Sequence, residues 1–337
     1  MRRQLPVVVA FCVLLLAAAA CTPAQRSALA PADAPAAVPT SHPVSLLSLR
    51  AKPLDGGDFK LGRVISANAA YTRYYVTYRS GELKISGIMN VPSGKGPYPL
   101  LLLNHGYIDP AVYTNGRGLK REQDYLARAG YVVLHSDYRN HADSDRESDP
   151  EQRFRMGYAE DVMNAIAAVR AADLPFVDAS RVGMLGHSMG GGVTLQLMAA
   201  KPDLITAAVL FAPVSGDARD NFERWTTSRP STTAQIIAAY GRPEDNPAFW
   251  DNLSPLTYVN EFLTPVQIHH GTVDNDVPIS WSDRLYTRLQ AAGKESQFFV
   301  YRGEPHEFIN AWPTVMRRTT QFFDVHVKAT TTPSAVR

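Results

Sequence analysis

Residues 182–192 read Val-Gly-Met-Leu-Gly-His-Ser-Met-Gly-Gly-Gly, and this stretch decides the fold. Its apolar start predicts a buried strand, and the residues from 189 onward predict a helix. Between them, the segment Gly186-His-Ser-Met-Gly190 has the Gly-x-Ser-x-Gly spacing of a nucleophile elbow, where a serine occupies a strained turn from strand to helix. The glycines are needed because side chains in their place would collide with neighbouring backbone. We therefore predict that Ser188 is an exposed, reactive serine.

Apolar strands and amphipathic helices alternate on both sides of this turn. The apolar blocks are residues 100–103, 131–134, 182–185, 207–211, 266–268 and 298–301, and helical patterns fall at about 118–129, 155–172, 189–201, 280–292 and 307–327. Strands that are apolar on both faces belong to parallel sheets covered by helices. Upstream, residues 71–78 and 83–91 predict an antiparallel hairpin that turns at Ser80-Gly81. The predicted fold class is α/β, with a mostly parallel, doubly wound sheet and an antiparallel N-terminal hairpin.

A long segment separates the blocks at 207–211 and 266–268, and we expect residues 214–262 to form a short helical cap insertion. Its aromatic residues are Phe222, Trp225, Tyr240, Phe249, Trp250 and Tyr258. Aromatic side chains near a reactive serine are candidates to line an apolar substrate pocket. For each one taken singly, however, we expect packing of the cap onto the sheet.

A serine hydroxyl is a weak nucleophile, so it needs a general base that an acid orients. In doubly wound hydrolases the chain order is serine, acid, histidine, with the acid and histidine each after a late strand. Asp274 and Asp276 both follow the strand at 266–268, and His306 follows the strand at 298–301. The predicted catalytic residues are therefore Ser188, one of these two aspartates, and His306.

Attack by the serine places negative charge on the substrate oxygen, which preorganised hydrogen-bond donors stabilise. One predicted donor is the backbone N–H of Met189, the residue after the nucleophile. The second is expected in the loop after residues 100–103, where Gly106 permits close approach of the backbone. There Tyr107 offers its N–H or its phenol hydroxyl, and the residues alone leave both open.

Other polar clusters are interpreted as structural. His269 and His270 lie at the end of a strand, and the acidic loop at residues 141–147 is typical of a solvated turn. We therefore predict no metal site and no cofactor.

Several motifs together resemble the α/β-hydrolase superfamily, and specifically the catalytic domain of the prolyl oligopeptidase (S9) family and its dienelactone-hydrolase-like relatives. The matching segments are Asn104-His-Gly-Tyr107, Val177-Asp-Ala-Ser-Arg181, Gly186-His-Ser-Met-Gly-Gly191, Ser254-Pro-Leu-Thr-Tyr258, His270-Gly-Thr-Val-Asp274-Asn-Asp-Val-Pro278 and Tyr301-Arg-Gly-Glu-Pro-His306. The resemblance covers residues 83–323. It implies that Asp274 is the catalytic acid and that Asp276 is a loop residue, a candidate to cap the helix after Pro278. It also favours the hydroxyl of Tyr107 as an oxyanion donor.

The resemblance implies a serine hydrolase that cleaves carboxylic ester or peptide bonds through an acyl-enzyme. The peptidases of the family carry a β-propeller upstream, for which residues 22–43 leave no room, so specificity is expected to come from the domain itself. The expected substrate is a small ester or a short peptide. The alternatives are a carboxylesterase with no peptidase activity and a non-catalytic binding lipoprotein; the oligomeric state is not predicted.

Composition supports an ordinary globular domain and gives no indication of a polyanionic partner. The 337 residues are 45% hydrophobic and 20% charged, and 34 basic against 32 acidic residues give a net charge of +2. Nothing in this balance favours binding of nucleic acid.

The first residues have the pattern of an export signal. Arg2 and Arg3 precede an uncharged run from Leu5 to Ala20, too short to span a bilayer as a helix, which leads directly into Cys21. Residues 1–20 are therefore predicted to be a signal peptide. The alanine-rich end resembles the lipobox of bacterial lipoproteins, with Cys21 lipidated, although Ala18 stands where that motif more often has leucine. Plain secretion and an uncleaved anchor are the alternatives.

The predicted organisation continues with an Ala/Pro-rich tether at 21–44, the hydrolase domain at 45–328 and a flexible tail at 329–337. The expected location is the extracytoplasmic side of a membrane, reached through the N-terminal lipid.

Overall fold

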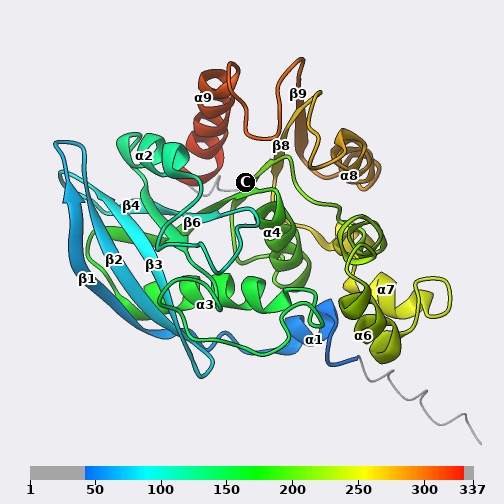
Figure 1. The fold of residues 1–337 in the computed structure, drawn as a ribbon. Helices are drawn as coiled ribbons and strands as arrows, with labels where there is room; N and C mark the ends of the chain where they lie inside the picture. Colours follow the sequence, from blue (N-terminus) through cyan, green and yellow to red (C-terminus); the bar gives the residue numbers. More distant parts are fainter. Residues whose placement is uncertain (1–41, 330–337) are drawn as a thin grey trace, which may run out of the picture. The chain divides into compact units, whose positions relative to one another are not determined.

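A computed structural model describes residues 42–329 of the chain. Their centre is a nine-stranded sheet in the order β1-β2-β3-β5-β4-β6-β7-β8-β9 (Figure 1). The predicted signal peptide, Cys21 and nearly all of the tether and tail lie outside the described residues. Within the described part, no helix is both long and apolar enough to cross a membrane.

The sheet is antiparallel at one side and parallel over the rest. Strands β1, β2, β3 and β5 pair antiparallel, and β5, β4, β6, β7, β8 and β9 pair parallel. The bounds are β1 (Gly57–Ala67), β2 (Tyr71–Ser80), β3 (Leu83–Pro92), β4 (Tyr98–Asn104), β5 (Val132–Ser136), β6 (Val177–His187), β7 (Ala207–Phe211), β8 (Val266–Gly271) and β9 (Ser296–Tyr301). The predicted fold class is confirmed.

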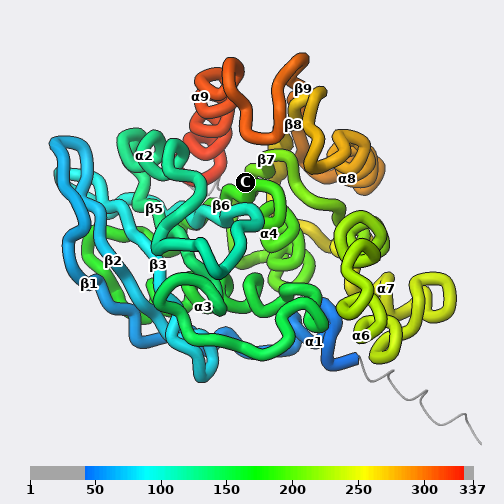
Figure 2. The backbone as a smooth tube through the Cα atoms, viewed as in Figure 1, coloured from blue at the N-terminus to red at the C-terminus, as the bar shows by residue number. Residues whose placement is uncertain are grey.

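Helices cover both faces of the sheet. Those outside the insertion are α1 (Leu46–Ala51), α2 (Lys120–Arg128), α3 (Met156–Ala172), α4 (Met189–Ala200), α8 (Ile279–Ala291), α9 (Trp312–Phe323) and the π-helix η3 (Asp324–Lys328). Side chains of α2 and α9 enter one apolar core, and those of α3, α4 and α8 enter the core on the opposite face. Figure 2 shows α2 and α9 together, on the other side of the sheet from α3.

All secondary-structure elements of the insertion between β7 and β8 are helices. It contains α5 (Ala218–Asn221), η1 (Phe222–Thr226), α6 (Pro230–Tyr240), α7 (Pro247–Leu253) and η2 (Pro255–Glu261). Trp250 is fully buried, with its ring centroid 4.8 Å from that of Phe222, and Tyr240 stacks on Phe249 at 4.6 Å. These four rings thus hold the insertion together. Phe222, Phe249 and Trp250 also belong to the buried core that includes strand residues, which agrees with the expected packing of the cap onto the sheet.

The predicted helix over 307–327 is wrong at its start. The helix begins only at Trp312, because the preceding residues form a loop. One carboxylate oxygen of Glu304 accepts the backbone N–H groups of Ile309 at 2.6 Å and Asn310 at 3.1 Å, and Phe308 has a φ of 50°. This loop is what carries His306.

Candidate active site

Ser188 lies at the turn between β6 and α4, in a conformation that side chains rarely adopt. Its φ is 56° and its ψ is −121°. A Cβ atom at Gly186 would lie 2.3 Å from the carbonyl oxygen of Gly190, and one at Gly190 would lie 1.9 Å from that of Asn104. Both positions therefore require glycine, for the steric reason inferred from the sequence.

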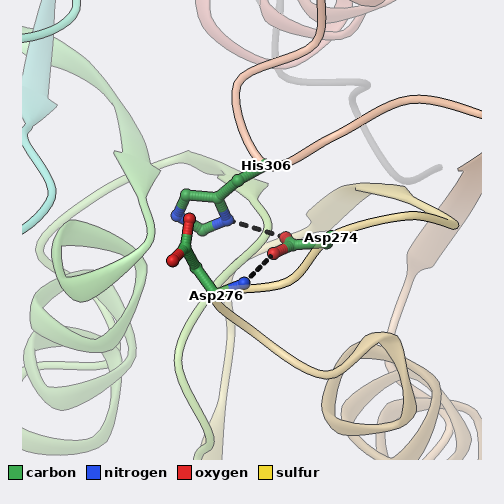
Figure 3. Close-up of side chains that lie close together, drawn as sticks. All are labelled: Asp274, Asp276 and His306. Atoms are coloured by element: carbon green, nitrogen blue, oxygen red, sulfur yellow. Dashed lines mark hydrogen bonds and ion pairs between the residues drawn. The ribbon is translucent and has the colours of Figure 1, made fainter.

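Asp274 and His306 come together after adjacent strands. Asp274 follows β8 and His306 follows β9, and the Nδ1–H group of His306 donates to the Asp274 carboxylate at 2.7 Å (Figure 3). With the proton on Nδ1, the Nε2 atom of His306 carries the lone pair and can accept a proton. Of the two aspartates that the residues left open, Asp274 is the one bonded to the histidine.

The Asp274 carboxylate is held on all sides. Besides His306, it accepts the backbone N–H groups of Asp276 at 2.9 Å and Val277 at 2.8 Å, and Nε2 of His270 lies 3.1 Å away. Burial alone would raise the pKa of Asp274, but the bonds from His270 and His306 outweigh it and hold that pKa well below its usual range. The carboxylate is therefore charged at neutral pH and fixed in orientation.

His270, expected to be structural, has a contact that the sequence analysis did not identify. It is fully buried, and its Nε2 atom lies 3.1 Å from the Asp274 carboxylate. Its other nitrogen bonds to the hydroxyl of Ser282 at 2.7 Å, which fixes the ring. His269 does have structural contacts, to Tyr301 and Gln267, each at 2.7 Å. An indication of this contact in the sequence is the short spacing between His270 and Asp274, which one tight turn can bring together.

His187 supports the other side of the His306 ring. Its Nε2–H donates to the carbonyl oxygen of His306 at 3.2 Å, and the two ring centroids are 4.5 Å apart. Desolvation, and next the neighbouring His306, lower the pKa of His187 to about 3. It is therefore neutral at physiological pH and packs beside His306 without adding charge.

One cavity of about 920 Å³ is lined by both Ser188 and His306. Its floor lies beyond the carboxyl ends of the parallel strands, where ligands bind in sheets of this type. The insertion contributes Phe222 and Trp225 from η1, so two of the predicted cap aromatics do line the pocket. Within residues 42–329 the hydroxyl of Ser188 makes no hydrogen bond to His306; such catalytic contacts often tighten only when substrate binds.

Both predicted oxyanion donors lie beside the serine. Met189 is the first residue of α4, so its N–H has no carbonyl partner within the helix. A Cβ at Gly106 would lie 3.1 Å from the Cβ of Ser188, which places the Gly106-Tyr107 peptide against the nucleophile. The Tyr107 side chain lines the cavity, is 60% exposed and lies under the guanidinium of Arg155, 5.0 Å from the ring centroid.

One trio of side chains in the described residues has the spacing of a metal site. Ligand atoms of Asp274, Asp276 and His306 lie within 4.8 Å of one another. A metal ion there would compete with the hydrogen bond between His306 and Asp274. In the acidic loop at 141–147, Asp145 accepts the N–H of Lys84, and Glu147 pairs with Arg139 at 3.0 Å, so two of its carboxylates already have partners.

Asp276 does not cap the helix after Pro278, which was a wrong expectation. The N-terminus of α8 has no side-chain cap, and the Asp276 side chain lines the cavity instead.

Comparison with known proteins places the chain in a family. Residues 117–330, more than half of the chain, match the sequence profile of the prolyl oligopeptidase family. The chain belongs to the prolyl oligopeptidase family. The match includes Ser188, Asp274 and His306 and begins after Tyr107.

Proteins similar to this chain in sequence or in fold include peptidases and an esterase. The acylamino-acid-releasing enzyme of Arabidopsis thaliana is 26% identical over 216 residues, 62% of this chain and 27% of that protein, so the chain spans about a quarter of its length. The acylaminoacyl peptidase of Pyrococcus horikoshii matches with a TM-score of 0.60 at 20% identity, covering 77% of this chain and 42% of that one. Acetyl xylan esterase 1 of Thermoanaerobacterium sp. JW/SL YS485 matches with a TM-score of 0.59 at 19% identity, covering 78% and 87%. The two structural matches show a shared fold.

Proposed function

We propose that this chain is a serine hydrolase that cleaves carboxylic ester or amide bonds with Ser188, His306 and Asp274. The observation that carries the proposal is the 2.7 Å bond from His306 to Asp274, at a cavity whose wall also presents Ser188 on a strained turn. The family membership supports the same chemistry.

In the proposed mechanism, Nε2 of His306 takes the proton of Ser188 as its oxygen attacks the substrate carbonyl carbon. The resulting imidazolium is stabilised by the fixed, charged carboxylate of Asp274. His306 then gives the proton to the leaving alcohol or amine, and an acyl-enzyme remains on Ser188. Water, deprotonated by His306, attacks this ester, and the serine leaves with the proton returned to it.

The tetrahedral intermediates need donors for their oxyanion. We assign this role to the N–H of Met189 and to Tyr107, whose backbone N–H lies on the loop against Ser188. Removing one such donor typically costs about 10²–10³ in kcat. Esters and amides share every step, so the triad itself does not choose between them.

The experiment that tests this function is labelling with a fluorophosphonate probe, which reacts with an activated serine. Wild-type protein should be labelled, and Ser188→Ala should be neither labelled nor active while unfolding at the same temperature as wild type. A panel of p-nitrophenyl esters beside aminoacyl- and Pro-nitroanilides then assigns the bond. Turnover of Ser188→Ala within tenfold of wild type on the best substrate would refute the assignment.

Export and membrane attachment through a lipid on Cys21 are part of the same proposal. They rest on the N-terminal sequence pattern alone.

A further inference from the structure

The loop that carries Asp276 is fixed through its backbone. Its N–H donates to Asp274 at 2.9 Å, and its carbonyl oxygen accepts from Nε of Arg224 at 2.8 Å. The second guanidinium nitrogen of Arg224 donates to the carbonyl oxygen of Asn275 at 3.0 Å. Arg224 therefore holds this loop by its backbone and forms no ion pair with the Asp276 carboxylate.

The Asp276 carboxylate faces the reacting centre without a partner of its own. In the described part of the chain it makes no hydrogen bond or ion pair, and it lines the same cavity as Ser188. Figure 3 shows it beside the imidazole ring of His306, and an oxygen of it lies within 4.8 Å of a His306 nitrogen. The Asp276 carboxylate thus lies next to His306, the proposed general base, and no side chain of the described residues is paired with it.

The other acidic groups of the cavity differ from Asp276. Glu151 pairs with Arg155 at 2.6 Å and with Arg229 at 3.1 Å, so these three charged side chains are paired with one another within the protein. Glu122 is buried and accepts from the indole N–H of Trp312 at 2.6 Å. Glu307 is the other cavity-lining carboxylate without a partner among residues 42–329, which makes it a matched control.

A free carboxylate beside the base is complementary to a cation close to the scissile carbonyl. In an aminoacyl substrate, the α-ammonium group is separated from the carbonyl carbon by a single carbon atom, so it must lie near the nucleophile and the base. We propose that Asp276 binds the α-ammonium group of the substrate and makes the enzyme selective for aminoacyl esters and amides with a free amino group. This inference rests on the proposed serine hydrolase function.

The test compares leucine ethyl ester with N-acetyl-leucine ethyl ester, and phenylalanine ethyl ester with its N-acetyl form. Esters are suitable because both esterases and peptidases of this mechanism cleave them. Wild type should show a kcat/KM ratio of free to acetylated ester of about 10 or more, since a hydrogen bond to a charged group is worth roughly that factor. Asp276→Asn should bring the ratio close to one, and Glu307→Gln should keep the wild-type ratio.

A wild-type enzyme that prefers the acetylated esters, or cleaves neither form, overturns the inference. So does an Asp276→Asn variant with the wild-type ratio, or a Glu307→Gln variant with the same loss. Labelling of Ser188 by the fluorophosphonate separates the two levels. If Ser188 is labelled but the ratio does not depend on Asp276, only the assignment of Asp276 fails; if Ser188 is not labelled, the proposed function itself fails.

Discussion

At the scale of single residues, Asp274 is the group on which the site is built. Its carboxylate is contacted by two histidines and two backbone N–H groups, and all four contacts favour the charged form. This arrangement keeps His306 in the tautomer that can take a proton at Nε2.

The first prediction follows from that orientation. Asp274→Asn should lower kcat by about 10⁴, because the amide favours the wrong tautomer of the histidine. Asp276→Asn should cost far less on N-acetyl-leucine ethyl ester, because Asp276 does not bond to His306. Steady-state kinetics of both variants decide the point, and the reverse ranking would show that Asp276 is the catalytic acid.

The second prediction concerns pH. His306 must be unprotonated to accept the serine proton, and histidine is the side chain that ordinarily changes charge between pH 5 and 8. Asp274 and His187, whose pKa values are lowered, stay charged and neutral, respectively, over that range. The value of kcat/KM should therefore be higher at pH 8 than at pH 5, because a protonated base cannot accept the serine proton. A profile that is flat from pH 5 to 8 would exclude histidine as the base.

At the scale of elements, the interior of the sheet holds uncharged histidines. His135 on β5 is fully buried with no partner for either ring nitrogen in the described structure, and it stacks on His105 at 5.3 Å. Burial lowers the pKa of His105 and of His269 to about 3, and that of His135 well below its ordinary value. In the unfolded chain all three take up protons below pH ~6.5.

The third prediction is acid sensitivity with a defined sign. Below pH ~6.5 the unfolded state binds more protons, so the free energy of unfolding should fall by about 1.4 kcal/mol per pH unit for each of these histidines. His135→Leu removes one of them and an unsatisfied polar group. Urea unfolding at pH 7 and pH 5 should show a smaller loss for the variant than for wild type. Equal losses would mean that His135 is already protonated or exposed.

Sequence patterns predicted the central strands well, because short uninterrupted apolar stretches leave few alternatives to a buried strand. Strand β1 was missed, since it is an edge strand with mostly exposed residues and pairs with β2 through irregular register shifts. The short α1 was missed as well, because two buried leucines within six residues make too weak a periodic signal.

The residues of the site likewise fall into those that the sequence predicted and those that it did not. Ser188 and His306 follow strand ends and could be located by spacing, whereas spacing left Asp274 and Asp276 as equal candidates for the acid and only the family resemblance chose Asp274. The contact of His270 with Asp274 depends on a turn after β8, and that of His187 with His306 on two loops from distant parts of the chain. Contacts of this kind arise only when the sheet brings the loops together, so linear spacing does not report them.

At the scale of the whole described body, the N-terminal segment closes the core. Leu46 and Leu49 of α1 are buried, Arg50 pairs with Glu261 at 2.6 Å, and Lys201 donates to the carbonyl oxygen of Arg50 at 2.6 Å. The fold therefore needs the chain from about residue 42 onward.

The fourth prediction compares two truncations. Removal of residues 1–41 should leave kcat/KM within about twofold, because the described residues from Gly106 to Phe308 supply both the catalytic groups and the lining of the cavity. Removal of residues 1–52 should also destabilise the fold by about 3–6 kcal/mol, from the loss of two buried leucines. Thermal and urea unfolding measure the difference, and equal stability of the two truncations would contradict the role assigned to α1.

The last prediction concerns where the molecule resides. If Cys21 carries lipid, full-length protein expressed in a bacterium should fractionate with membranes and enter the detergent phase on partition. Cys21→Ser should abolish lipid incorporation and leave an uncleaved precursor or a water-soluble product. Cys12→Ser is the matched control, because Cys12 lies inside the predicted signal peptide and should have no effect. Attachment through acyl chains is hydrophobic, so wild type and Cys12→Ser should stay membrane-bound at high salt. A purely electrostatic association would be released under these conditions. Wild-type protein found entirely in the aqueous phase, with a mature N-terminus other than Cys21, would refute the lipid anchor.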